Sequence, residues 1–111
     1  MNALALVASL LLAQSNPPPF PAPRHTQATA TLRCDWGSVA QVDGPNGRLL
    51  VQTNIGVITY IVSPSDPVYA PDGLGAGTVS GLRTGQPLHV YFHYANDGAR
   101  VDEIDLDPAS R

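Results

Sequence analysis

The sequence has no lysine, a single cysteine and a single glutamate among its 111 residues. Its six basic residues are all arginines, they are scattered singly, and the net charge is −3. A nucleic-acid-binding protein carries a basic patch or stripe, so this pattern argues against nucleic acid as a partner. The lone cysteine, Cys34, cannot form an intrachain disulfide, which leaves a small buried side chain or a thiol that pairs between chains.

The chain also lacks an apolar run that could span a bilayer. Its longest such run, residues 3–13, falls short of the about 20 residues that a hydrocarbon core requires. An apolar run of this length at the N-terminus is typical of a secretory signal peptide, and Ala13 and Ser15 supply the small residues of a cleavage site. We expect residues 1–15 to be removed as a signal peptide, giving a periplasmic or secreted protein with no stable membrane insertion.

Proline is concentrated directly after this run. Five of the nine residues from Asn16 to Arg24 are proline, a composition typical of an extended, solvated segment. We therefore expect a disordered linker at residues 16–27, one small domain at residues 28–108 and a short tail at residues 109–111. A domain of about 80 residues has room for one narrow core and not for a cleft between two lobes.

The domain shows no sustained helical periodicity. β-branched and aromatic runs alternate with glycine, proline, asparagine and aspartate, which is the pattern of strands and turns. The pattern predicts five strands, at Thr31–Val42, Arg48–Thr53, Val57–Val62, Leu88–Tyr94 and Arg100–Leu106. Short strands at this spacing favour an all-β fold, a small five-stranded barrel, over βαβ units. The long connection at residues 63–81 is expected to be functional or disordered.

The fourth predicted strand carries the candidate binding residues. Because alternate residues of a strand face opposite sides, Leu88, Val90 and Phe92 are expected in the core. The outer face then presents a mixed histidine and tyrosine surface, formed by His89, Tyr91 and His93. This face, with the connection at residues 63–81, is the predicted site for an unidentified protein, peptide or saccharide ligand. A solvated face without any ligand is the alternative.

Neither a catalytic nor a metal-binding constellation is evident. The two histidines of the fourth strand stand ~13 Å apart along it, too far to share one metal ion. The glycine-rich residues 73–77 lack the strand-to-helix context of a phosphate loop. The acidic residues near the end of the last strand read as a solvated edge rather than a calcium site: Asp102, Glu103, Asp105 and Asp107. We expect a non-catalytic module with no cofactor.

The order of these segments resembles the small OB-like barrels that bacteria export. The matching segments are 37–43, 49–51, 58–62, 82–92 and 101–106. One such group is a broad family of unknown function, and another is the periplasmic copper-chaperone type of barrel. The resemblance implies the fold, through turn glycines and alternating apolar positions.

The copper-chaperone type binds Cu(I) with methionine and histidine ligands and a nearby tryptophan on its second and third strands. The corresponding positions of this chain hold Gln52, Thr53, Thr59 and Tyr60, and the only methionine is Met1. A binding module of unknown ligand is therefore the expected function. The alternative is a periplasmic copper or zinc carrier or sensor that uses His89, His93, Cys34 and acidic neighbours.

Overall fold

The structure, a computed structural model, describes residues 19–108. The predicted signal peptide and the predicted tail lie outside the described residues. Within residues 19–108, no helix is both long and apolar enough to cross a membrane. The elements are strands β1 (Arg33–Asp43), β2 (Arg48–Thr53), β3 (Gly56–Ile61), β4 (Pro67–Tyr69), β5 (Gly75–Thr78), β6 (Pro87–Ala95) and β7 (Gly98–Leu106), with a 3-10 turn η1 (Val79–Gly81).

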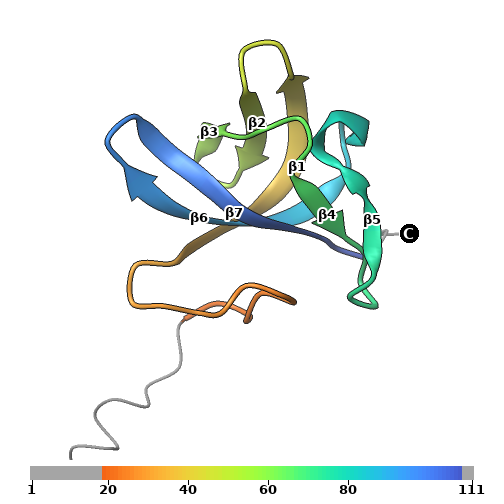
Figure 1. Ribbon diagram of the computed structural model, residues 1–111. Helices are drawn as coiled ribbons and strands as arrows, with labels where there is room; N and C mark the ends of the chain where they lie inside the picture. The colour runs from red at the N-terminus through yellow and green to blue at the C-terminus, as the bar shows by residue number, and fades with distance from the viewer. Residues whose placement is uncertain (1–18, 109–111) are drawn as a thin grey trace, which may run out of the picture.

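Five of these strands close into a barrel (Figure 1). β1 lies antiparallel to both β2 and β6, β2 lies antiparallel to β3, and β6 lies antiparallel to β7. A parallel pairing of β3 with β7, at Ile61 and Arg100, joins the two ends of the sheet. The predicted all-β, five-stranded barrel is confirmed, and its five strands are those expected from the sequence.

A sharp bend in β1 makes this closure possible. The first half of β1 pairs with β6 and the second half pairs with β2, and the exchange occurs at Gly37 and Ser38. A Cβ atom on Gly37 would overlap the main-chain oxygen of Gln52 and would lie 2.9 Å from its carbonyl carbon. Glycine is required here because the backbone of β2 approaches too closely for any side chain.

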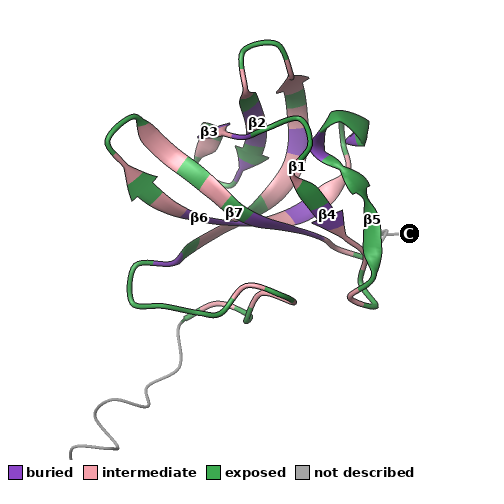
Figure 2. Cartoon of the chain, viewed as in Figure 1, coloured by how far each residue is buried: buried purple, intermediate pink, exposed green. Residues whose placement is uncertain are grey.

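The core fills the interior of the barrel. Leu88, Val90 and Phe92 are 0%, 0% and 4% exposed, as the alternation in the fourth predicted strand required (Figure 2). They pack with apolar side chains from the other strands and from the connection, namely Val39, Leu49, Val51, Tyr60, Val62, Val68, Val79, Leu82 and Ile104. None of the described residues before β1 belongs to this cluster, so the barrel has a complete core without them.

The long connection between β3 and β6 is ordered along part of its length. β4 runs parallel to β7 and β5 pairs with β4, so the two short strands extend the sheet beside the barrel (Figure 1). Val68 and Val79 anchor the connection because both are buried in the core. This arrangement places Tyr69 and the turn after it next to the C-terminal end of β7.

Candidate functional site

Residues 19–27, called the arm below, lie across the outer side of the sheet formed by β1, β6 and β7 (Figure 1). Phe20 packs edge-on against Tyr91 with ring centroids 6.1 Å apart. The Tyr91 hydroxyl donates a hydrogen bond of 2.7 Å to the carbonyl oxygen of Pro21. The linker expected at residues 16–27 stays a prediction; within that range, residues 20–26 contact the sheet. Prolines have no N–H to satisfy, so this part of the chain can lie flat on the sheet.

Two carboxylates of β7 hold the other end of the arm. Glu103 accepts hydrogen bonds from three successive backbone N–H groups, those of Arg24 at 2.7 Å, His25 at 3.1 Å and Thr26 at 2.6 Å. The Arg24 N–H also lies 3.1 Å from Oδ2 of Asp105. Hydrogen bonds to a charged group contribute about 1.5–3 kcal/mol each, so Glu103 is the main anchor of the arm.

The solvated acidic edge expected from the sequence is thus wrong for these two residues. Glu103 and Asp105 are 2% and 3% exposed, since the arm covers the face of β7 on which they lie. Three backbone N–H groups replace the water that a bare carboxylate would need, which is why Glu103 tolerates this burial. Asp102, in contrast, is exposed, as expected.

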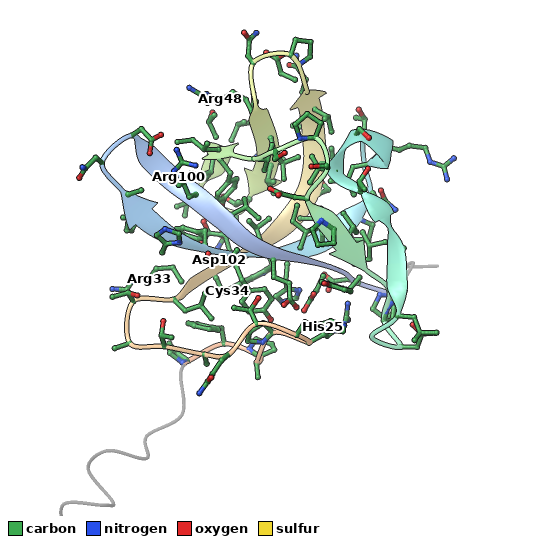
Figure 3. All side chains as sticks on the ribbon, in the orientation of Figure 1. His25, Arg33, Cys34, Arg48, Arg100 and Asp102 are labelled. Carbon is green, nitrogen blue, oxygen red and sulfur yellow. The ribbon has the colours of Figure 1, made fainter. Side chains whose placement is uncertain are left out.

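The side chains of the arm reach the β4–β5 connection. The Arg24 guanidinium Nη1 donates to the carbonyl oxygens of Leu106 at 2.8 Å and Tyr69 at 3.3 Å. The His25 ring stacks on Tyr69 with centroids 3.8 Å apart, and its Nε2 lies 2.6 Å from the carbonyl oxygen of Gly73 (Figure 3). The arm therefore bridges β6, β7 and the connection.

The two buried carboxylates differ in protonation. Burial, then the hydrogen bond with Glu103, raise the pKa of Asp105 to about 7. Burial alone would also raise the pKa of Glu103, but hydrogen bonds from Asp105, Thr26 and His25 lower it below its usual range. Asp105 Oδ1 is buried and receives no hydrogen bond from the described residues, which leaves it free to carry the proton. Between the lowered pKa of Glu103 and the raised pKa of Asp105, Glu103 is ionised and Asp105 is protonated.

The free energy of unfolding is expected to fall as the pH rises from 3.8, the ordinary pKa of Asp105, to about 7. The folded state holds this proton more tightly than the unfolded state, so the stabilisation is complete below 3.8 and is lost as the pH rises through about 7. Glu103 acts in the opposite sense: its contribution is present above 4.5 and is lost as the pH falls.

Thermal unfolding followed by circular dichroism at pH 5 and pH 8 tests this, with a higher midpoint expected at pH 5. The Asp105→Asn variant keeps the shape of the protonated side chain, so the difference between the two pH values should largely disappear. An Asp105→Asn variant with the full wild-type pH dependence would contradict the assignment.

Beyond the arm, the same outer face is more open. Cys34 pairs across the strands with Tyr91, and Trp36 pairs with His89, so these four side chains share the face. Trp36 is 55% exposed, and its ring stacks beside His89 with centroids 6.1 Å apart. His89 Nδ1 lies 2.7 Å from a carboxylate oxygen of Asp107, which fixes the orientation of the ring.

The three residues predicted for the site have different surroundings. His89 and Tyr91 are neighbours, with ring centroids 6.4 Å apart. Tyr91 is only 2% exposed, because Phe20 and Pro21 of the arm lie against it. A binding role for Tyr91 stays a prediction. His93 lies farther along β6, and its Nδ1 is 2.9 Å from Asp102.

Cys34 lies on the side of the sheet that faces the arm (Figure 3). The thiol is partly buried, and this burial raises its pKa to about 12. The hydrogen bond with Tyr91 lowers the pKa in part, and the nearby carboxylates of Asp35, Asp105 and Asp107 raise it. A thiol with so high a pKa is a poor nucleophile at neutral pH. Because Cys34 lies on the face that the arm covers, its reactivity reports whether the arm is in place.

No set of three histidine, cysteine, aspartate or glutamate side chains within residues 19–108 comes close enough together to hold a metal ion. His89 and His93 instead each pair with one carboxylate, Asp107 and Asp102. The polar groups of the site therefore form hydrogen bonds mainly with a polypeptide backbone.

No protein-family model matches the chain, and no curated protein matches its sequence. Among solved structures, two forms of CusF match. A tryptophan-to-alanine variant of CusF from Escherichia coli, in a Cu(II) form, covers 75% of this chain and 100% of its own, with a TM-score of 0.52 and 11% identity. The Ag(I) form of CusF covers 68% and 97%, with a TM-score of 0.50 and 11% identity. The chain thus has the fold of the CusF barrel, as the sequence pattern implied.

Proposed function

We propose that this chain is an exported, non-catalytic binding module that holds an extended polypeptide segment on the outer face of β1, β6 and β7. The observation that carries the proposal is the arm itself, an extended segment bound to that face by three backbone N–H groups on Glu103. Backbone hydrogen bonds combined with spaced side-chain contacts are the usual means by which small domains bind extended peptides. Export is inferred from the apolar N-terminal run.

The arm can leave this face without unfolding the barrel. Of the residues that join it to β1, those at positions 28–31 are exposed and Leu32 is buried. The core cluster contains no described residue of the arm. The face that the arm would uncover combines aromatic rings, a hydroxyl group and carboxylates, and the proposed site includes His89, Tyr91, His93 and Trp36.

Peptide display against the mature chain, residues 16–111, tests this function. Selected peptides should shift the amide NMR signals of β1, β6 and β7. The Trp36→Ala and His89→Ala variants should each bind about tenfold more weakly, because exposed aromatic side chains commonly dominate binding surfaces. Ile55→Ala is the matched control, since Ile55 is 81% exposed on the distant β2–β3 turn. Equal binding by Trp36→Ala, His89→Ala and the wild type would rule out this placement.

A metal carrier remains the second candidate, because both structural neighbours are described with a bound metal, Cu(II) or Ag(I). Such a carrier would need Cys34, His89 or His93 to join ligands that the present arrangement keeps apart. Calorimetric titration of the mature chain with Cu(I), Cu(II), Zn(II) and Ni(II) separates the two functions. A metal carrier should bind one ion with a Kd below roughly 10 μM, about −7 kcal/mol; weaker binding would exclude it.

A further inference from the structure

We infer that the arm stands in for a segment of another protein that carries prolines followed by an arginine, and that the carbonyl oxygens of Tyr69 and Leu106 select the arginine. This inference rests on the proposed function and specifies its ligand. The face that the arm covers has two parts, one that donates a hydrogen bond to the arm and one that accepts hydrogen bonds from it.

One part of the face supplies aromatic surface and a donor. Tyr91 presents its ring to Phe20 and donates its hydroxyl to the carbonyl oxygen of Pro21. The described polar contacts of this part require no N–H from the ligand. Proline, which has a carbonyl oxygen but no N–H, satisfies these requirements without leaving a buried donor unpaired.

The other part supplies acceptors. Both oxygens of Glu103 and Oδ2 of Asp105 receive backbone N–H groups, while the carbonyl oxygens of Tyr69 and Leu106 receive the guanidinium group of Arg24. Both carbonyl contacts of Arg24 come from one guanidinium nitrogen, Nη1. A ligand for this part must therefore present consecutive backbone N–H groups and a side-chain nitrogen with two N–H donors. The planar guanidinium group holds these two N–H bonds in fixed directions, which the compact ammonium group of lysine does not reproduce.

The arm does not use all the acceptors of this part. Asp105 is 3% exposed, and its Oδ1 receives no hydrogen bond from the described residues. A segment that brings one more polar group to this oxygen, a donor when Asp105 is ionised or an acceptor when it is protonated, would make every contact of the arm and one more. Such a segment could bind more tightly than the arm and displace it.

Competition with the chain's own arm favours a segment of another protein over the arm of a second copy of this chain. A tethered segment acts at an effective concentration of the order of millimolar, so an identical arm from a second copy would lose the competition at ordinary concentrations. A foreign segment competes with the same tethered arm, but one additional hydrogen bond, about 0.5–1.5 kcal/mol, lowers the concentration at which it displaces the arm by up to about tenfold. The exposed residues at positions 28–31 allow the displaced arm to move aside.

The test uses the mature chain with two substitutions in the arm, Phe20→Ala and Arg24→Ala, which remove its ring contact with Tyr91 and its guanidinium contacts with Tyr69 and Leu106. The arm of this variant is held mainly by its backbone and competes less well with an added peptide, and the core is not altered. A labelled peptide of residues 19–27 is titrated against this variant by fluorescence anisotropy. The wild-type peptide should bind at least tenfold more tightly than peptides with Arg24→Ala or Arg24→Lys. Adding Glu103→Gln to the chain should weaken binding of the wild-type peptide by at least tenfold.

Equal affinity for the three peptides, no binding up to millimolar peptide, or indifference to Glu103→Gln would overturn the inference. A wild-type chain that is dimeric at micromolar concentration in sedimentation analysis would assign the face to a second copy and would also overturn it. Display selection keeps this failure distinct from failure of the proposed function. Selected peptides that bind the face but lack proline and arginine would refute only the ligand class.

Discussion

Replacing Gly37 with alanine is expected to lower the free energy of unfolding by about 3 kcal/mol, at the upper end of what overpacking usually costs. The new Cβ atom would overlap the main-chain oxygen of Gln52 and press against a methyl group of Val51 at 3.2 Å. Neither neighbour can move freely, because both belong to β2 and Val51 is fully buried. The β1–β2 pairing must therefore separate at the bend that closes the barrel.

Thermal unfolding measures this effect, and about 3 kcal/mol corresponds to a fall in Tm of roughly 12–24 °C for a domain of this size. Gly81→Ala is the matched control, since no atom lies within 4 Å of the position its Cβ would take. That variant should keep the wild-type Tm within a few degrees. A Gly37→Ala variant as stable as Gly81→Ala would show that β1 and β2 do not approach each other as described.

Replacing Glu103 with glutamine is expected to release the arm. The amide oxygen of glutamine can still accept hydrogen bonds, but the amide nitrogen would face the N–H groups that Glu103 now binds. Loss of even one hydrogen bond to a charged acceptor, about 1.5–3 kcal/mol, raises the open population at least tenfold. The barrel core should remain folded, because no described residue of the arm belongs to it.

The rate at which iodoacetamide alkylates Cys34 reports this opening. Cys34 is the only cysteine, and it lies beside Tyr91 on the face that the arm covers. Alkylation should accelerate at least tenfold in Glu103→Gln. Asp97→Asn is the control for removing a carboxylate, since Asp97 is exposed and pairs with Arg100 on the β6–β7 hairpin. Equal alkylation rates in wild type and Glu103→Gln would argue against Glu103 as the anchor.

The barrel could be predicted because its determinants are local. Alternating apolar residues identified β6, and the turn residues around Gly47 and Gly98 separated strands that are adjacent in space. The bend at Gly37 also has a local signal, since glycine within a strand pattern marks a close approach of backbones. Each of these signals lies within a few residues of the feature that it predicts.

The covered site could not be predicted in the same way. Its main contacts join Arg24 and Glu103, which are 79 residues apart in the sequence. Nothing in the composition of a proline-rich segment indicates which surface it lies on. The sequence placed Glu103 and Asp105 on one strand, but only the position of the arm decides that they are buried.

A bulge in β7 added a second difficulty. Phe92 pairs with Val101 and Tyr91 pairs with Glu103, so Asp102 is an extra residue between the two pairs. The extra residue lets Val101 pack against the core while Glu103 faces the arm. Simple alternation would have put these two side chains on the same face.

Hydrogen exchange at the backbone amides of Arg24, His25 and Thr26, followed by NMR on the mature chain, tests the central claim most directly. These amides should be protected in the wild type, because each donates to the buried carboxylate of Glu103. Their protection should be lost in Glu103→Gln, while that of Val90 and Ile104 in the barrel remains. Exchange of the three amides at the rate of an unstructured peptide in the wild type would contradict the claim that this face holds an extended segment.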